Sequence, residues 1–467
     1  MTINNIHKKN HFAEMGRTLQ LAVPVVIGMV ASFSMNFVDT VMAGRLPQKE
    51  IALAGIATGG AIWSAVLMFV LGVLMSLQPV VAHLDGSGNR AQGGAAARQG
   101  MWISLGVSVP FVLVLLSGGF LLQWMSVGPD IVPTAVKYMD ALVWGAPGVC
   151  LLMVLRFFSE GSGYTRPTMY MGLLGVMLNV PLNYILMFGK LGMPELGAQG
   201  CGYATSIVIW VQLLAMFFYV RWHDHFKDFE LFARWDWPQW PEMVKLLRIG
   251  LPIGGGIFVE GGLFIVAALL IARLGALPTA AHLIAINYSA MVFMVPLGLA
   301  SAVTTRVGNA LGRGEPEAAR YAGLIGLVIV LFTQTLSAST LLFFPEFIVR
   351  IYTNDAAISS IAVSLLFYAA IFQYADGVQV CAAGALRGLK DTVVAMYINI
   401  LAYLVLGLSA GYYLTFAKNM GPAGMWIGLI VGLSVGAVLL LARFLLKSGE
   451  LVRLGNAEAL VVKSPEN

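Results

Sequence analysis

Three acidic residues lie deep inside long apolar segments of this 467-residue sequence. Asp39 follows the stretch SFSMNFV, Glu260 lies within GGGIFVEGG, and Asp376 lies within QYADGVQ. A charged side chain at the centre of a membrane-spanning helix costs about 2.5–3.5 kcal/mol on insertion scales. We therefore expect these carboxyl groups to face a polar cavity, where each could hold a small cation or a proton. The alternative is that each accepts a buried hydrogen bond from a neighbouring helix.

The polar neighbours of these acids recur at helical spacing, which favours a cavity. Asn36 precedes Asp39 by three residues, so the two side chains share one face of a helix. Asp376 is flanked at the same spacing by Gln373 and Gln379. Glu260 and Asp376 lie at comparable depths from the basic residues that flank their segments, and they could meet.

The segment NVPLN, residues 179–183, is a further candidate site. Asn179 and Asn183 are four residues apart and share a helix face, and Pro181 between them removes one backbone hydrogen bond. Amide and carbonyl oxygens can bind a hard cation or accept a proton from a carboxylic acid. Thr205, in GYATS, could reach the same pocket. The alternative is a kinked helix held by amide hydrogen bonds to a neighbour.

The composition places these residues in a membrane protein. Hydrophobic residues make up 58% of the chain, charged residues only 11%, and the mean hydropathy is +0.82, whereas soluble domains carry about 25% charged residues. Apolar runs long enough to span a bilayer recur along the chain. We predict an all-α protein with twelve spans near 18–42, 53–81, 100–122, 135–155, 168–188, 198–220, 247–272, 282–304, 321–344, 359–385, 393–415 and 423–442.

The two halves of the sequence repeat. Pro24 and Pro252 are separated by nearly half of the chain, and the segments FGK at 188–190 and FAK at 416–418 are separated by the same interval. The loop glycines Gly88 and Gly314 have almost the same separation. This common offset indicates duplication of a six-helix unit, and because six is even, both copies enter the membrane from the same side. A pseudo-two-fold axis along the membrane normal should then relate them, with a binding site between the copies.

The repeat divides the chain into two lobes and two connecting segments. We predict an N-terminal lobe at 1–220, a linker at 221–246, a C-terminal lobe at 247–446 and a tail at 447–467. Most of the 28 Lys and Arg residues fall on the side of the membrane that carries the N-terminus. This excess predicts that both termini and the linker are cytoplasmic. Anionic lipid then explains the basic pI of about 9.0 without a nucleic-acid partner.

Several motifs together resemble the multidrug and toxic compound extrusion (MATE) family, in particular its NorM-type bacterial branch. The resemblance covers essentially the whole chain. The motifs are FVDTVMAG, NVPLNYI, ELGAQGCGYAT, the glutamate of the seventh span and DGVQVCAAGALRGLKDT. It implies a twelve-helix, two-lobe antiporter of the bacterial inner membrane. Such a protein exports hydrophobic organic cations, including dyes and fluoroquinolone antibiotics, in exchange for inward H⁺ or Na⁺.

The resemblance also implies roles for the residues above. Asp39, Asn179, Asn183 and Thr205 would line a cavity of the first lobe, and Glu260 and Asp376 would form a cation site of the second lobe, with Na⁺ as its metal if Na⁺ is the coupling ion. Related sequences carry tyrosine four residues before the second-lobe aspartate, where this chain has Phe372. One hydroxyl that could hold Na⁺ is therefore missing, and H⁺ remains open.

Other classes of membrane protein fit the sequence less well. A flippase for lipid-linked pyrophosphates should carry Lys or Arg inside its spans, whereas the buried charges identified in this sequence are acidic. A membrane enzyme should carry a nucleophile with its base or a metal motif such as HExxH, and none is recognisable. We therefore expect a transporter that is not an enzyme, works as a monomer in the lipid bilayer and needs no cofactor beyond its coupling ion.

Overall fold

The computed structural model of the chain describes residues 3–463, and it describes side chains between residues 12 and 455. Residues 464–467 of the predicted tail lie outside the described part. Helices account for all of the regular structure in residues 3–463. In chain order they are α1 (Ile3–Ala43), α2 (Lys49–Leu74), α3 (Leu77–Gly86), α4 (Arg90–Leu116), α5 (Gly118–Trp124), α6 (Val132–Val143), α7 (Ala146–Gly161), α8 (Arg166–Phe188), α9 (Ala198–Trp222), η1 (Asp224–Phe229), α10 (Trp240–Ala272), α11 (Ala276–Gly312), α12 (Pro316–Phe343), α13 (Pro345–Tyr352), α14 (Ala356–Gly388), α15 (Thr392–Asn399), η2 (Ile400–Leu408), α16 (Ser409–Tyr412), η3 (Tyr413–Ala417) and α17 (Pro422–Lys463).

The predicted membrane spans agree with the helices. Within the described residues, eleven helical segments are long and apolar enough to cross a bilayer. The predicted span at 135–155 is a twelfth candidate formed by α6 and α7, which are bent by 50° at a short break. Trp144 and Gly145 form that break, and Pro147 follows it at the start of α7, where a missing backbone N–H costs no helical hydrogen bond.

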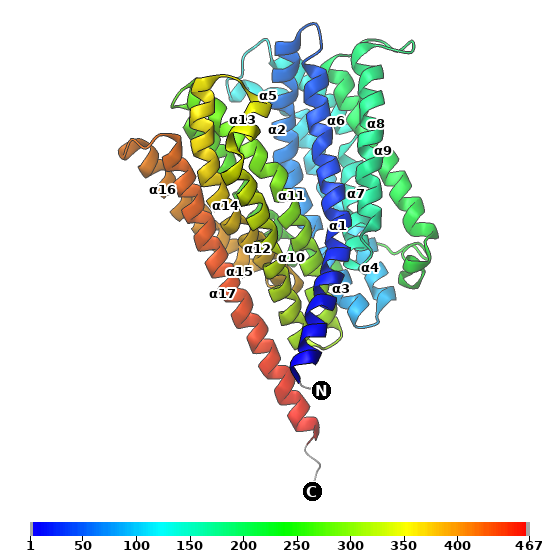
Figure 1. The fold of residues 1–467 in the computed structure, drawn as a ribbon. Coiled ribbons are helices and arrows are strands. Elements are labelled where there is room, and N and C mark those ends of the chain that lie inside the picture. The colour runs from blue at the N-terminus through cyan, green and yellow to red at the C-terminus, as the bar shows by residue number, and fades with distance from the viewer. Residues whose placement is uncertain (1–2, 464–467) are drawn as a thin grey trace. The chain divides into compact units, whose positions relative to one another are not determined.

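The eleventh span is wound differently from the others. Between α15 and α17 the chain forms two π-helical stretches, η2 and η3, separated by the single α-helical turn α16. Figure 1 labels α15, α16 and α17 in this part of the chain. A π-helix carries more residues per turn than an α-helix, and such stretches are frequent at functional sites. Residues 393–415 contain no proline, and the glycines Gly407 and Gly411 do not by themselves predict π-helical winding.

The chain packs into two compact units. Unit 1 contains Met1–Val26, Ala82–Gly88 and Gly255–Asn467, and unit 2 contains Ile27–Val81 and Asn89–Gly254. In unit 1, α14 packs against α11, α12 and α17. In unit 2, α9 packs against α6, α7 and α8, and α4 packs against α7. The boundaries of the units differ from the predicted lobes 1–220 and 247–446, whose division of the chain remains a prediction.

The difference lies largely in two equivalent half-helices. The units divide α1 after Val26 and α10 after Gly254, and these two positions are equivalent in the sequence repeat. A Cβ atom on Gly72 would come within 2.5 Å of the Cα of Gly254, and one on Gly298 would come within 2.5 Å of Cγ2 of Val26. The first half of α10 therefore packs in unit 2, and the first half of α1 packs in unit 1. The duplication thus extends to the contacts of each half-helix.

The predicted linker is held against α4. Arg98 donates from Nε to Oδ2 of Asp236 at 2.6 Å, and the Gln99 amide donates to the Trp237 carbonyl at 3.1 Å. These bonds satisfy linker groups while Trp235 and Trp237 remain exposed. Exposed tryptophans on a fixed backbone suit the headgroup level at which tryptophan is enriched.

Candidate functional site

Asp39 lies in the second half of α1 and accepts two hydrogen bonds from α8. Asn179 donates from Nδ2 to Oδ1 of Asp39 at 3.0 Å, and Asn183 donates to the same oxygen at 2.5 Å. Asp39 is 7% exposed, and both asparagines are fully buried. One carboxylate oxygen thus receives two amide donors. We call Asp39, Asn179 and Asn183 the Asp39 site.

Buried acceptor oxygens without donors occur on the residues that bond this carboxyl group and on Thr205. Among the described residues, Oδ1 of Asn179, Oδ1 of Asn183 and Oγ1 of Thr205 are buried and accept no hydrogen bond. The two amide oxygens belong to the groups that donate to Asp39, so they lie close to its carboxyl. Buried polar groups in proteins normally have partners. The Asp39 site therefore has unused capacity to ligate a cation or to accept a proton.

Two neighbours of Asp39 were not predicted from the sequence. The thiol of Cys201, on α9, lies in hydrogen-bonding range of the Asp39 carboxyl, and Tyr138, on α6, lies within electrostatic range. Both side chains are buried. Cys201 precedes Thr205 by one helical turn. The motif GYATS therefore lies on α9, the same helix that carries this thiol. Asn36 is exposed and is not among the recorded partners of Asp39.

A second acidic site lies in unit 1. Glu260, on α10, and Asp376, on α14, lie within electrostatic range of each other. Asp376 is 4% exposed and its Oδ1 has no hydrogen-bond partner in the described part of the chain. The same holds for the side-chain oxygens of Gln373 and Gln379, which flank Asp376 on α14. We call Glu260 and Asp376 the Glu260–Asp376 site.

Arg387 corrects the expectation that the buried charges are acidic. It lies at the end of α14, is 8% exposed, and is within electrostatic range of Glu260. The predicted span at 359–385 left Arg387 just outside the apolar segment, on the cytoplasmic side. Its long side chain lets the guanidinium reach groups well away from its own backbone. With both carboxylates ionised, these three groups carry a net charge of minus one.

The eleventh span contributes polar groups to the same region. Tyr403, in η2, is fully buried, lies next to Gln379 and is within electrostatic range of both Glu260 and Asp376. Asn399, one turn earlier, has its amide nitrogen beside Gly256, which precedes Glu260 by one turn on α10. No sequence motif indicated either residue. Only the packing of the eleventh span against α10 and α14 identifies them.

The aromatic residues around Asp376 have separate surroundings. Phe372 is buried against Phe264 and Trp426 with ring centroids 6.0 and 5.6 Å apart. Tyr374 donates its hydroxyl to Oγ1 of Thr335 at 3.2 Å in an exposed setting, so it does not replace the hydroxyl missing at 372. His282 lies against Trp426 with ring centroids 5.9 Å apart.

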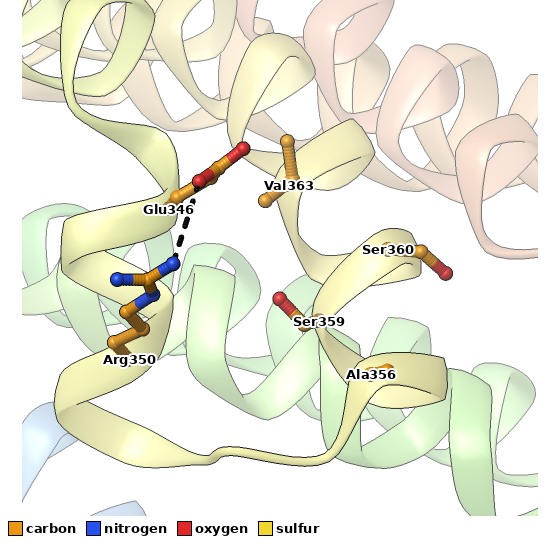
Figure 2. A pocket seen from close by; sticks show the side chains of 6 residues that line it. All are labelled: Glu346, Arg350, Ala356, Ser359, Ser360 and Val363. Atoms are coloured by element: carbon orange, nitrogen blue, oxygen red, sulfur yellow. Dashed lines mark ion pairs between the residues drawn. The ribbon is translucent and has the colours of Figure 1, made fainter.

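Two surface cavities lie away from the carboxyl pair. One of about 300 Å³ is lined by α13 and α14; Figure 2 shows Glu346 and Arg350 on one side and Ser359 pointing toward them from the other. The pair Glu346–Arg350 is 3.9 Å apart and highly exposed. The other cavity, of about 400 Å³, is lined by Met42, one turn beyond Asp39, and by Tyr184, next to Asn183. None of Asp39, Asn179 and Asn183 lines it.

The donor set suits a hard monovalent cation better than a transition metal. Within the described residues, no group of three or more His, Cys, Asp and Glu side chains could hold a metal ion. The Glu260–Asp376 site instead combines two carboxyl groups with amide and hydroxyl oxygens. Oxygen donors of this kind bind hard cations.

Comparison with known proteins identifies the repeated segment. The MatE family model matches residues 24–185 and matches again at residues 252–413. The starts of the two matches, and likewise their ends, are separated by the same interval as Pro24 and Pro252. The family match therefore confirms the duplication inferred from those prolines. The two matches together cover more than half of the chain.

Curated relatives align with nearly the full length. The chain is 44% identical over 432 residues to the probable multidrug resistance protein NorM of Xanthomonas campestris pv. campestris, covering 92% of this chain and 94% of the relative. It is 39% identical over 453 residues to the multidrug resistance protein PmpM of Pseudomonas aeruginosa, covering 94% and 93%. Among solved structures, the eukaryotic MATE transporter AtDTX14 superposes with a TM-score of 0.87 at 20% identity, covering 96% of this chain and 99% of that one.

Proposed function

Because this chain belongs to the MatE family of membrane transporters, we propose that it exports hydrophobic organic cations in exchange for inward H⁺ or Na⁺. The relatives reported above are named as multidrug resistance proteins, which supports drugs as its cargo. Dyes and fluoroquinolones are the cargo that the family resemblance implies. Export would proceed across the bacterial inner membrane, and the transporter would work as a monomer. The distribution of Lys and Arg predicts that both of its termini lie in the cytoplasm.

The observation that carries this proposal is the pair of acidic sites, one from each half of the duplicated sequence. Asp39 is buried with two amide donors on one oxygen, and unused acceptor oxygens lie beside it. Glu260 and Asp376 are paired in the other half, with a single arginine within range of Glu260. Isolated carboxylates are costly in a bilayer. Sites that alternately hold a coupling cation and a cationic drug give these charges a use.

Exchange follows if the two ligands compete for the same negative charge in oppositely facing states. A coupling cation that enters from outside neutralises a carboxylate and favours the state that opens inward. A cationic drug that enters from the cytoplasm or the inner leaflet favours the state that opens outward. Each ligand shifts the equilibrium only by its differential affinity for the two states. A membrane potential of 100 mV adds about 2.3 kcal/mol for each elementary charge moved inward.

The buried Arg387 raises the alternative of an anionic cargo such as a lipid pyrophosphate. Its position does not favour that alternative, because the carboxyl group that interacts with it is that of Glu260. An arginine neutralised by a carboxylate offers no net positive charge to an anion. With one positive and two negative groups, the Glu260–Asp376 site would be neutralised by a single monovalent cation, which fits exchange with cationic drugs.

Efflux from proteoliposomes under an imposed Na⁺ or pH gradient tests the proposal. A fluorescent cationic dye serves as cargo, and Asp39→Asn, Glu260→Gln and Asp376→Asn are compared with the parent. Glu346→Gln is the matched control, because Glu346 is exposed and belongs to none of these sites. We expect one gradient to drive efflux, at least one of the three test variants to lose it, and the control to retain it. If all three variants transport as the parent does, the carboxyl groups do not couple transport.

A further inference from the structure

We propose that Tyr403 is a ligand of the coupling cation at the Glu260–Asp376 site, where its hydroxyl replaces the one that Phe372 lacks. The inference rests on the proposed function and deepens it, since it commits this site to Na⁺. No motif in the sequence identified Tyr403. Its assignment comes from the winding and packing of the eleventh span.

The Tyr403 hydroxyl has the surroundings of a ligand rather than of a packed core group. Tyr403 is fully buried, and within the described part of the chain its hydroxyl has no partner that meets hydrogen-bond geometry. It lies within hydrogen-bonding range of the Gln379 side chain and within electrostatic range of Glu260 and Asp376. Buried tyrosine hydroxyls usually find a hydrogen-bond partner. Because the Gln379 side chain does not reach bonding geometry, the Tyr403 oxygen, beside two carboxyl groups, is available to a bound ion.

The local backbone directs Tyr403 into this position. Tyr403 lies in the π-helical stretch η2, whose wider turn rotates side chains away from their α-helical directions. The span packs closely on α17, where the Cα of Gly432 lies 3.0 Å from a Cβ built on Gly407. A Cβ built on Gly436 would lie 3.3 Å from the Tyr403 ring and 3.7 Å from its hydroxyl. Glycine at 436 therefore leaves room for the ring.

Three further buried oxygens on the helices near Tyr403 are of the types that ligate a dehydrated hard cation. Oδ1 of Asp376, Oε1 of Gln379 and Oδ1 of Asn399 are all buried without hydrogen-bond partners in the described residues. Asn399 precedes Tyr403 by one turn, and its amide lies beside Gly256, one turn before Glu260. Carboxylate, amide and hydroxyl oxygens are the ligands that hard cations prefer. A cation among them would satisfy several oxygens at once.

A proton would leave most of these oxygens unsatisfied. It neutralises one carboxyl group and forms one hydrogen bond from it, so at most one further acceptor gains a partner. Na⁺ takes several oxygen ligands and neutralises the same single net charge that Glu260, Asp376 and Arg387 leave. The number of free oxygens therefore favours Na⁺ at this site.

The test compares Tyr403→Phe, which removes only the oxygen, with the double variant Phe372→Tyr/Tyr403→Phe, which returns a hydroxyl on the Asp376 helix. Tyr397→Phe is the matched control, because Tyr397 precedes Tyr403 by six residues and is exposed. Binding of radioactive Na⁺ to the purified full-length protein and the Na⁺ dependence of dye efflux are measured, together with the unfolding temperature. We expect Tyr403→Phe to raise the half-saturating Na⁺ concentration about tenfold, the size of one lost ligand contact. The double variant should recover most of the affinity, and the control should match the parent.

Unchanged Na⁺ affinity in Tyr403→Phe would overturn the inference, and so would a parent protein that binds no Na⁺. If Tyr403→Phe lowers both the Na⁺ affinity and the unfolding temperature, the substitution disturbs the packing of the core. That result would also overturn the inference. Glu260→Gln and Asp376→Asn separate this failure from failure of the proposed function. If these two lose coupled efflux while Tyr403→Phe binds Na⁺ normally, only the role of Tyr403 is wrong.

Discussion

Gly86 and Gly312 make the same contact in reciprocal fashion within unit 1. A Cβ atom on Gly86 would collide with the Asn309 carbonyl, and a Cβ atom on Gly312 would collide with the His83 carbonyl. The two glycines have the same separation in the sequence as His83 and Asn309. The ends of α3 and α11 thus meet backbone to backbone through equivalent positions of the two repeats. Asn309 also donates from Nδ2 to Oδ2 of Asp85 at 2.8 Å, which ties the two ends together.

This contact predicts that Gly86→Ala and Gly312→Ala each destabilise the protein and slow transport. Each methyl group must displace a carbonyl group of the backbone rather than a flexible side chain. Overpacking of this kind typically costs about 1–3 kcal/mol. The unfolding temperature and the rate of dye efflux report the effect. Gly60→Ala is the control, since its Cβ would meet nothing within 4 Å. Alanine variants at 86 and 312 that unfold and transport as the Gly60 variant does would contradict the close contact.

Removal of one of the two amide groups that donate to Asp39 should weaken transport, although the Asp39 carboxyl group itself is retained. Asn183→Ala leaves Asn179 as the only asparagine donor to Oδ1 of Asp39. Hydrogen bonds to charged groups contribute about 1.5–3 kcal/mol, so we expect at least a tenfold rise in the half-saturating concentration of the coupling cation or of the dye. Asn36→Ala, on the same helix as Asp39 but exposed, is the control. Equal effects of the two substitutions would show that the Asp39 site has no special role.

The interaction between Arg387 and Glu260 can be tested by a double-mutant cycle. Arg387→Met removes a buried positive charge that lies within electrostatic range of Glu260. The buried carboxylate is then less well compensated, so we expect the free energy of unfolding to fall. Glu260→Gln in the same chain should restore much of the lost stability, because the uncompensated charge is removed with it. The free energy of unfolding of the parent, both single variants and the double variant gives the coupling energy. Additive effects would mean that the two groups do not interact.

The sequence was sufficient for the features that depend on periodicity. The runs of apolar residues predicted all twelve spans, with the fourth appearing as the bent pair α6 and α7. The offset between Pro24 and Pro252 predicted the duplication that the family match confirms. The spacing of Asn179 and Asn183 placed them on one helix face, and both bond Asp39. Each of these inferences uses neighbours along a single helix or a regular interval along the chain.

The features that the sequence did not reveal depend on contacts between helices. Cys201 and Arg387 gain their importance from the neighbours that packing gives them, and neither belongs to a local motif with a defined chemistry. The position of Tyr403 depends in addition on the π-helical winding of η2, which no proline in the sequence predicts. The division of α1 after Val26 and of α10 after Gly254 between the two units also cannot be predicted from hydropathy. A continuous apolar helix can change its packing partners midway without any change in its hydropathy.

Competition between drug and coupling cation tests the central claim most directly. Equilibrium binding of a fluorescent cationic dye to the purified protein is measured while Na⁺ or H⁺ concentration is raised in turn, for the parent and for Asp39→Asn, Glu260→Gln and Asp376→Asn. If negative side chains are shared by the two ligands, one of these cations will weaken dye binding in proportion to its own occupancy, and at least one of the three substitutions will abolish that dependence. Dye affinity that is indifferent to both cations in the parent, or competition that survives in every variant, would contradict the account.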